Sequence, residues 1–247
     1  MKTTIKLFTL LFGIFAFAAN LNAGQTEPLK LNSMNVFLDK DEVMTAKKQA
    51  ALTPKDVLKD LMDGNERFMK NKETDWDLPA QARKTASGQY PKAVVLACID
   101  SRVPVEYIFD QGIGDIFTAR VAGNFENVDI LGSMEFGTKV AGSKLILVLG
   151  HEHCGAVKAA IDGAELGNIT EMLDEIEPAI EKSQDFKGEK TSKNEDFVAH
   201  VCENNVEITM NDIRERSPII REMEEKGEIM IVGAVYDLDT GKVTLLD

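Results

Sequence analysis

The sequence predicts an α/β fold with a mainly parallel central β-sheet flanked by helices, and three observations support this. Residues 93–98 form a short, continuous apolar run rich in β-branched side chains, which is typical of a strand buried on both faces. Similar strand patterns follow at residues 115–121 and 145–150. Helical patterns separate the strands, and such an alternation of strand and helix indicates a mainly parallel sheet.

The N-terminal segment, residues 1–23, has the layout of a secretory signal peptide. Lys2 and Lys6 precede an apolar stretch at residues 7–19, which is shorter than the roughly 20 residues that a membrane-spanning helix needs. Small residues then lead to Ala23, where we expect cleavage, with Ala19 as the second choice. We therefore expect an exported protein, in the bacterial periplasm, with no membrane attachment after the signal is removed.

An N-terminal arm or linker is predicted for residues 24–52, because this stretch is polar and mixed. The folded domain is expected over residues 53–247 and begins with an N-terminal helical arm. Thr53 suits the N-cap of that helix, and the following proline suits its first position. Residues 71–92 hold few periodic apolar side chains and are expected to be mostly loop.

The second half of the chain continues the alternation and closes with a hairpin. Residues 229–236 and 242–246 are strand-like and flank an Asp-Thr-Gly turn, so we expect a C-terminal hairpin or edge strand. Residues 183–194 are polar and are expected to form an exposed loop. Helices are expected at 130–140, 155–161, 169–180 and 198–213, with a short one from Ser217.

The composition excludes several classes of protein. The chain has 247 residues, of which 44% are hydrophobic and 28% charged, so wholesale disorder is excluded. Its formal net charge of -13 argues against a nucleic-acid or anionic-membrane partner, since both require clustered positive charge. Three cysteines are too few for a disulfide scaffold.

Side chains able to bind a metal follow two of the predicted strands. Cys98 ends the first strand, and His151 and Cys154 come directly after the strand at 145–150. In open α/β sheets, sites form outside the carboxyl ends of strands, so these side chains can converge. Two thiolates and an imidazole suit Zn²⁺. The alternatives are core positions for the cysteines or a Cys98–Cys154 disulfide.

The motifs resemble those of the β-class carbonic anhydrases. The first is residues 97–104 (ACIDSRVP), and the second is residues 150–155 (GHEHCG). The resemblance continues through residues 110–115, 120–124 and 232–237. It therefore covers essentially the whole predicted domain and implies the same α/β fold.

The resemblance implies a carbonic anhydrase, that is, a carbonate dehydratase, with one Zn²⁺ per subunit. Cys98, His151 and Cys154 would hold the metal and leave a fourth position for water. Attack of zinc-bound hydroxide on CO2 would give bicarbonate and a proton, reversibly. Asp100 would orient the hydroxide, and Arg102 would hold Asp100 by a charge-assisted bond. On the residues alone, these last two could equally form a simple surface ion pair.

The resemblance also implies a small substrate pocket. Gln89 would donate to a CO2 or bicarbonate oxygen, and the N–H of Gly155 would favour developing negative charge at a helix N-terminus. Phe117 and Phe136 would form an apolar wall, although Phe136 replaces a common tyrosine. By residue type alone, Gln89 could be an ordinary loop residue and both phenylalanines could belong to the core. Val95 stands where members with an inhibitory bicarbonate site have tryptophan.

The remaining histidines and the third cysteine have weaker interpretations. His153 lies beside the ligand motif and could shuttle protons, although a packing or solvent-facing role is the alternative. His200 and Cys202 lie on the late helix, away from either motif, and we assign them to packing.

Three other functions remain open from the sequence. The same fold and metal could act on CS2 or COS. A non-catalytic relative would use Asp100 as a fourth zinc ligand and close the site. A redox protein using Cys98 and Cys154 is disfavoured by the lack of a C-x-x-C motif. Relatives in the family assemble, so we expect a homodimer or higher oligomer with the site near a subunit interface.

Overall fold

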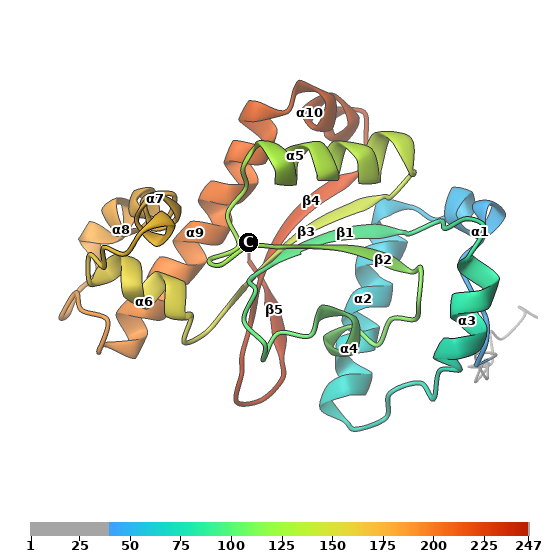
Figure 1. Cartoon of the computed structure of the whole chain (residues 1–247), viewed down its shortest axis with the longest axis horizontal. Coiled ribbons are helices and arrows are strands. Elements are labelled where there is room, and N and C mark those ends of the chain that lie inside the picture. The colour runs from blue at the N-terminus through green and yellow to red at the C-terminus, as the bar shows by residue number, and fades with distance from the viewer. Residues whose placement is uncertain (1–39, 247) are drawn as a thin grey trace, which may run out of the picture. The chain divides into compact units, whose positions relative to one another are not determined.

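The computed structural model describes residues 40–246, and within them the centre of the fold is a five-stranded β-sheet (Figure 1). The strand order is β2-β1-β3-β4-β5; β5 pairs antiparallel with β4, and the other neighbours are parallel. The strands are β1 (Ala93–Ala97), β2 (Ile116–Arg120), β3 (Leu145–His151), β4 (Met230–Tyr236) and β5 (Val243–Leu245). The predicted α/β class and its closing hairpin are confirmed.

Helices cover both faces of this sheet, and alternate residues of the strands face opposite layers. Val95 of β1 packs with α2 and α4, whereas Val94 packs with α5, α9 and α10. This period of two is why the central strands are apolar throughout. The helices are α1 (Ala46–Ala51), α2 (Pro54–Met69), α3 (Leu78–Thr85), α4 (Val105–Ile108), α5 (Val128–Glu135), α6 (Gly155–Ile161), α7 (Asn168–Asp174), α8 (Glu177–Lys182), α9 (Glu195–Arg216) and α10 (Pro218–Glu225).

Regular structure begins earlier than the sequence predicts. α1 lies inside the predicted arm at 24–52, where the side chain of Thr45 accepts a hydrogen bond from the N–H of Lys48. Gln49 is buried and donates to the carbonyl oxygens of Pro91 and Ala141, both at 2.8 Å. The end of the arm is therefore part of the domain, because its polar side chain bonds backbone groups that are distant in sequence.

Four other predicted segments differ in detail. α3 forms within the segment 71–92 expected to be loop, with Asp77 as its N-cap and a proline in its first turn. The helix expected at 130–140 is α5 followed by one π-helical turn, η1 (Phe136–Val140). The helix expected at 169–180 is divided into α7 and α8, because Pro178 cannot continue a preceding helix and instead occupies the first turn of α8. The loop expected at 183–194 begins with a short 3₁₀ turn, η2 (Ser183–Asp185).

The predicted signal peptide lies outside the described residues, as does the first part of the predicted arm. Within residues 40–246, no helix combines the length and the apolar character needed to cross a membrane.

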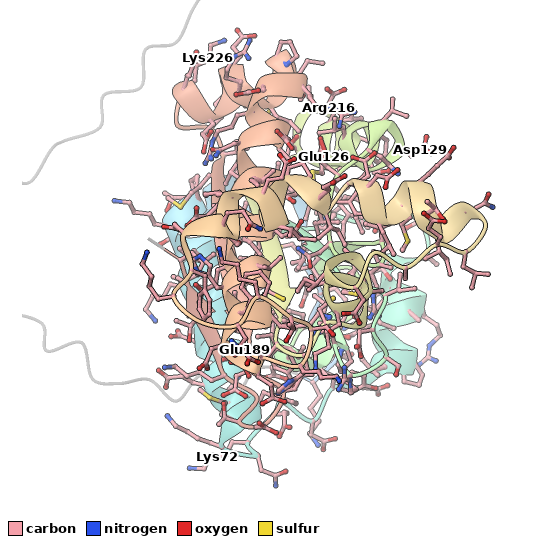
Figure 2. All side chains as sticks on the ribbon, turned by 90° about the vertical axis from the view of Figure 1, so that its left-hand side faces the viewer. Lys72, Glu126, Asp129, Glu189, Arg216 and Lys226 are labelled. Atoms are coloured by element: carbon pink, nitrogen blue, oxygen red, sulfur yellow. The ribbon has the colours of Figure 1, made fainter. Side chains whose placement is uncertain are left out.

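The loop after β2 is fastened to α9 at two points. The buried carbonyl oxygen of Gly123 accepts a hydrogen bond from Nδ2 of Asn205 at 2.7 Å. Near the other end of the same loop, Arg216 donates to the buried carboxylate of Glu126, and Figure 2 shows the two side chains together. This loop lies against the carboxyl end of β1, so α9 restrains the edge of the sheet where the predicted site lies.

Candidate metal centre

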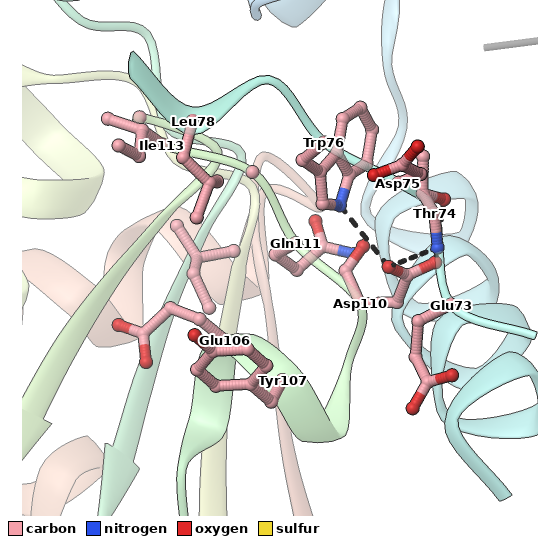
Figure 3. A pocket seen from close by; sticks show the side chains of 13 residues that line it. Glu73, Thr74, Asp75, Trp76, Leu78, Glu106, Tyr107, Asp110, Gln111 and Ile113 are labelled. Carbon is pink, nitrogen blue, oxygen red and sulfur yellow. Dashed lines mark hydrogen bonds between the residues drawn. The ribbon is translucent and has the colours of Figure 1, made fainter. Parts of the chain in front are cut away.

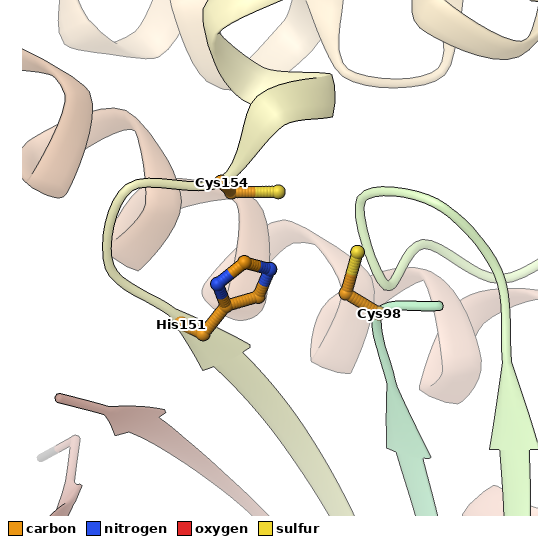
Figure 4. Close-up of side chains that lie close together, drawn as sticks. All are labelled: Cys98, His151 and Cys154. Carbon is orange, nitrogen blue, oxygen red and sulfur yellow. The ribbon is translucent and has the colours of Figure 1, made fainter. Parts of the chain in front are cut away.

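Three side chains that can bind a metal meet at the carboxyl edge of the sheet. Cys98 directly follows β1, His151 is the last residue of β3, and Cys154 is the N-cap of α6. β1 and β3 are parallel neighbours, with Ala97 opposite Leu149, so their ends lie side by side. The two sulfur atoms and a ring nitrogen of His151 lie within 4.8 Å of one another (Figure 4). The structure therefore brings the three predicted ligands together.

The donor atoms at this site suit a zinc ion. Nδ1 of His151 lies 2.8 Å from the carbonyl oxygen of Glu152, which we assign as an N–H donation. This bond leaves Nε2 as the lone-pair nitrogen, and Nε2 is buried with no hydrogen-bond partner among the described residues. Cys98 and Cys154 are free thiols and are also buried. A buried nitrogen without a partner beside two thiols is the arrangement that a thiolate- and imidazole-binding metal completes.

The two thiols affect each other strongly. The hydrogen bond with Cys154 is the main cause that lowers the pKa of Cys98, and His151 and the N–H of Gly123 lower it further. That N–H lies 3.4 Å from Sγ of Cys98. The same pairing with Cys98, together with burial, raises the pKa of Cys154. Because two adjacent buried thiolates repel each other, their joint ionisation calls for a cation between them.

Asp100 and Arg102 form a bidentate pair beside the three ligands. Nε of Arg102 donates to Oδ1 of Asp100 at 3.0 Å, and Nη2 donates to Oδ2 at 2.7 Å. The backbone N–H of Arg102 also donates to Oδ1 at 2.9 Å. These bonds from Arg102 lower the pKa of Asp100 to about 2, so its carboxylate is ionised at neutral pH. The carboxylate is directed to Arg102 and is not among the grouped ligand atoms.

Arg120 restrains the backbone beside Cys98, a role that was not predicted from the sequence. It lies at the end of β2, where its Nε donates to the carbonyl oxygen of Cys98 at 2.9 Å and its Nη2 donates to that of Asp100 at 2.6 Å. One guanidinium thus holds the backbone that carries both a metal ligand and the carboxylate. The sequence signal was its place in the Arg-x-Ala-Gly-Asn motif, at residues 120–124.

Comparison with known proteins identifies the family. A family model described as "Carbonic anhydrase" matches residues 93–243. Carbonic anhydrase 2 of Mycobacterium tuberculosis is 36% identical over 195 residues, which cover 76% of this chain and 91% of that protein. The chain belongs to the β-carbonic anhydrase family. The carbonic anhydrase of Mycolicibacterium smegmatis is 37% identical over 196 residues, covering 76% of this chain and 90% of its own length.

Solved structures of β-carbonic anhydrases share this fold. A Coccomyxa β-carbonic anhydrase, determined in complex with acetazolamide, is 27% identical with a TM-score of 0.61, over 66% of this chain and 75% of that chain. A β-carbonic anhydrase from Sordaria macrospora, described as tetrameric, has a TM-score of 0.60 at 24% identity, over 68% of this chain and 86% of that chain. The second likeness concerns the fold alone.

Three residues expected in the substrate pocket of a β-carbonic anhydrase do not reach the metal centre within one chain. Gln89 is exposed and precedes β1, whereas Cys98 follows it. Phe117 lies opposite Val94, near the start of β1. Its ring is 6.3 Å from that of Phe136, and both line a hollow of about 580 Å³ that contains no metal ligand. Within one chain, Phe117 and Phe136 therefore do not form the apolar wall that was predicted for the substrate pocket.

Gly155, which is predicted to bind substrate, lies next to one of the three grouped side chains. It is the first residue of α6, directly after Cys154, and it is exposed. A Cβ added to Gly155 would meet no atom within 4 Å, so space is open beside its backbone.

Cys202 lies closer to the metal centre than the sequence analysis placed it. α9 crosses the end of β3, and a Cβ added to Gly150 would lie 2.7 Å from Cγ2 of Val206 and 3.7 Å from the carbonyl oxygen of Cys202. Cys202 shares a buried apolar cluster with Cys98 and Cys154. Burial raises the pKa of Cys202 to about 12, so it stays a neutral thiol. The packing role is supported, but its distance from the motifs was predicted wrongly.

The other two histidines have structural partners. His153 has a φ of 52° and lies 3.6 Å from a carboxylate oxygen of Glu195, at the start of α9. His200 lies 3.8 Å from Asp185, and its ring is tilted against that of Phe186 at 5.6 Å. Neither is grouped with the metal ligands.

Proposed function

We propose that this protein catalyses the reversible hydration of CO2 to bicarbonate and a proton, using one zinc ion per subunit. The observation that carries the proposal is the group formed by Cys98, His151 and Cys154, with a buried Nε2 that has no partner among the described residues. Family membership supports the reaction, because the curated relatives are named carbonic anhydrases. Zinc would activate water, because it lowers the pKa of a water molecule bound to it to about 7.

The residues of the chain would orient the reacting groups. Asp100 is ionised at neutral pH and can accept a hydrogen bond from the reacting water. Arg102 keeps this carboxylate in one orientation through two bonds from a rigid guanidinium. The open space beside Gly155 would admit a small substrate oxygen next to a helix N-terminus.

The pairing of Asp100 with Arg102 favours catalysis over a closed, non-catalytic site. A carboxylate that became a fourth metal ligand would have to leave both guanidinium bonds, at 3.0 and 2.7 Å. Arg120 also restrains the backbone of Asp100 through its carbonyl oxygen. With a metal bound, this arrangement would leave one of its positions free for water.

A stopped-flow assay of CO2 hydration on the zinc-loaded protein tests the proposal. The cysteines offer a matched pair of variants, since Cys154 and Cys202 are both buried in the same apolar cluster. Cys154→Ser should lose zinc and activity together, whereas Cys202→Ser should keep both. Absence of a CO2-dependent rate above pH 8 in the loaded wild type would overturn the proposal, and faster turnover of COS or CS2 would reassign the substrate.

We also propose that the protein is a homodimer or a higher oligomer, assembled at the β2 edge of the sheet. β2 is an edge strand and is only half-buried. Phe136 is 54% exposed and Val128 74%, and both line a hollow together with residues of β2, which is unusual exposure for apolar side chains beside an edge strand. A second copy on this face would cover them and could bring Gln89 and Phe117 to a metal centre.

Sedimentation of two matched variants tests the assembly. Phe136→Asp places a charge on the exposed apolar surface beside β2 and should give a smaller species with reduced activity. Leu166→Asp changes a residue that is 68% exposed between α6 and α7, and it should assemble as the wild type does. A monomeric wild type with full activity would refute the assembly.

The location of the protein is a further part of the proposal. The signal-like sequence at residues 1–23 supports export to the periplasm, and its removal would change the formal charge from -13 to -15. Cell fractionation and N-terminal sequencing should find a periplasmic chain that begins at Gly24. A full-length chain retained in the cytoplasm would contradict export.

A further inference from the structure

Two of the three grouped side chains touch each other through their sulfur atoms. Cys98 and Cys154 share a hydrogen bond between their side chains, and both sulfur atoms lie within 4.8 Å of a ring nitrogen of His151 (Figure 4). Both cysteines are free thiols. Cys98 follows β1, whereas Cys154 is the N-cap of α6. The fold therefore brings two oxidisable sulfur atoms side by side from segments that are distant in sequence.

The backbone that carries the two thiols is restrained. Arg120 donates to the carbonyl oxygen of Cys98 at 2.9 Å, and the N–H of Gly123 donates to Sγ of Cys98 at 3.4 Å. The carbonyl oxygen of Cys154 accepts the N–H of Lys158 at 3.0 Å, in the first turn of α6. Both cysteines are buried, with exposed fractions of 4% and 1%. The contact between the two thiols is therefore built into the fold.

The third thiol of the chain lies in the same cluster but is placed differently. Cys202 shares a buried apolar cluster with Cys98 and Cys154. Its side chain is bonded to the backbone N–H of Cys154. The backbone of Cys154 thus faces Cys202, whereas its sulfur atom faces Cys98. This geometry favours a bond between Cys98 and Cys154 over any bond with Cys202.

A thiol with a second thiol beside it reacts with a hydroperoxide in a defined way. The first product is a sulfenic acid, which the neighbouring thiol converts to a disulfide. Without that neighbour, oxidation continues to the sulfinic and sulfonic acids, which a dithiol does not reduce. The pairing of two thiols therefore makes their oxidation reversible.

We propose that Cys98 and Cys154 form a reversible redox pair: when zinc is absent, hydrogen peroxide joins them in a disulfide, which excludes the metal until a dithiol reduces it. The sulfur atom of Cys98 attacks one peroxide oxygen, the O–O bond breaks and one water leaves, so that Cys98 becomes a sulfenic acid. The sulfur atom of Cys154 then attacks that of Cys98, the S–O bond breaks and a second water leaves. The two thiols lose two electrons and two protons, which reduce the peroxide to two waters.

Zinc and the disulfide exclude each other because both use the same two sulfur atoms. A cysteine binds a metal as a thiolate, and a disulfide has none. The pairing rests on the proposed function in one respect, because a centre that admits water and CO2 also admits hydrogen peroxide, which is of similar size. Space is open beside the backbone of Gly155, next to Cys154. The proposed export would place the chain in a compartment where disulfides persist.

Counting thiols in the full chain tests the proposal. Hydrogen peroxide is added to the zinc-loaded chain and to the chain from which a chelator has removed zinc, and the thiols are then counted in denaturant. The zinc-free chain should lose two of its three thiols, and dithiothreitol should restore all three together with zinc binding. The zinc-loaded chain should keep all three over the same time, because the metal occupies both sulfur atoms.

Peptide mapping identifies which cysteines have joined. Each cysteine lies in a different tryptic peptide, at residues 93–102, 145–158 and 194–214. We expect a disulfide between the first two peptides and a free thiol in the third. The same oxidation in urea is the control, because the unfolded chain should give a mixture of pairings.

Trp76 reports whether the zinc-free chain keeps its fold. It is the single tryptophan of the chain, and its Nε1 donates to the buried carboxylate of Asp110 at 3.2 Å. Figure 3 shows this bond in a hollow whose lining residues include no cysteine. Native Trp76 emission after removal of zinc would therefore show that the oxidation takes place in a folded domain.

Two cysteine variants separate the roles of the thiols. Cys154→Ser leaves Cys98 without its neighbour, so peroxide should carry Cys98 of the zinc-free variant to sulfinic and sulfonic acids, which dithiothreitol does not recover. Cys202→Ser is the matched control, because it removes a buried thiol of the same cluster. It should form the same disulfide as the wild type and recover in the same way.

Several results would overturn the proposal. A zinc-free chain that keeps its three thiols is one, and a disulfide that involves Cys202 is another. A third is irreversible oxidation of Cys98 to the same extent in the wild type and in Cys154→Ser. A zinc-free chain that gives the same mixture of pairings as the chain in urea would also overturn it. Because the readouts are thiols and peptide masses, CO2 hydration by the reduced, zinc-loaded chain still tests the proposed function by itself.

Discussion

Replacing Asn205 by alanine should loosen the loop beside the metal centre and weaken zinc binding. Asn205 is 2% exposed, and its Nδ2 donates to the carbonyl oxygen of Gly123 at 2.7 Å. The N–H of Gly123 lies 3.4 Å from Sγ of Cys98 and donates to it. α9 is therefore connected to a metal ligand through a single glycine.

The size of the effect follows from these contacts. Asn205→Ala leaves the buried Gly123 carbonyl without its side-chain donor, which costs about 1–3 kcal/mol of unfolding free energy. The void left by the amide adds to this, so we expect a total of about 2–4 kcal/mol. Losing a group that orients a metal ligand weakens metal affinity about 10- to 100-fold. Because Asn205 acts through Gly123 rather than on Cys98 itself, we expect the lower end of that range.

Zinc affinity, from competition with a chromophoric chelator, and urea unfolding of the zinc-free protein measure the two effects separately. Asn204→Ala is the matched control: Asn204 is also buried on α9, and its Nδ2 donates to Oγ of Ser183 at 2.7 Å, away from the Gly123 loop. It should lose similar stability and keep wild-type zinc affinity. Unchanged zinc affinity in Asn205→Ala, or an equal loss in both variants, would refute the reasoning.

Three further outcomes are expected. Arg102→Gln should lower kcat for CO2 hydration about 10- to 100-fold, because Asp100 loses its orientation. The control is Arg214→Gln, which breaks a bidentate pair far from the site and should leave the rate per bound zinc unchanged. Equal rates in the two variants would contradict this. Because Arg102 lowers the pKa of Asp100 from 3.8 to about 2, the stability that this pair adds is present above pH 4 and is lost as the pH falls toward 2. The difference in urea midpoint between zinc-free wild type and Arg102→Gln should therefore shrink over that interval, and a constant difference would count against it. Gly150→Ala should lower the free energy of unfolding, measured with urea, by about 1–3 kcal/mol, because the new Cβ would lie 2.7 Å from Cγ2 of Val206. An unchanged free energy of unfolding would show that α9 can move away from β3.

The strands and the metal ligands could be predicted because their signals are local. A run of apolar residues such as 93–98 predicts a buried strand without knowledge of its neighbours. Cys98 and the pair His151 and Cys154 come directly after such runs, and parallel strands end at the same edge. The short helices α1 and α3 were missed, because six and eight residues give little periodicity. Their N-caps, Thr45 and Asp77, were the available signals.

The residues that support the site could not be predicted, because their partners are remote in the chain. Asn205 bonds a carbonyl group 82 residues earlier, and Arg120 bonds one 22 residues earlier. A single sequence does not show which polar side chain of a long helix faces which loop. Phe136 belonged to the predicted wall, yet one chain does not bring it to the metal.

Zinc titration of the zinc-free protein, with the CO2 hydration rate followed by stopped flow at pH 8.5, tests the central claim most directly. The proposed centre of Cys98, His151 and Cys154 predicts a rate that rises in proportion to bound zinc and reaches a plateau at one zinc per chain. A rate that stays at the uncatalysed background when one zinc is bound, or activity that does not depend on zinc, would contradict it.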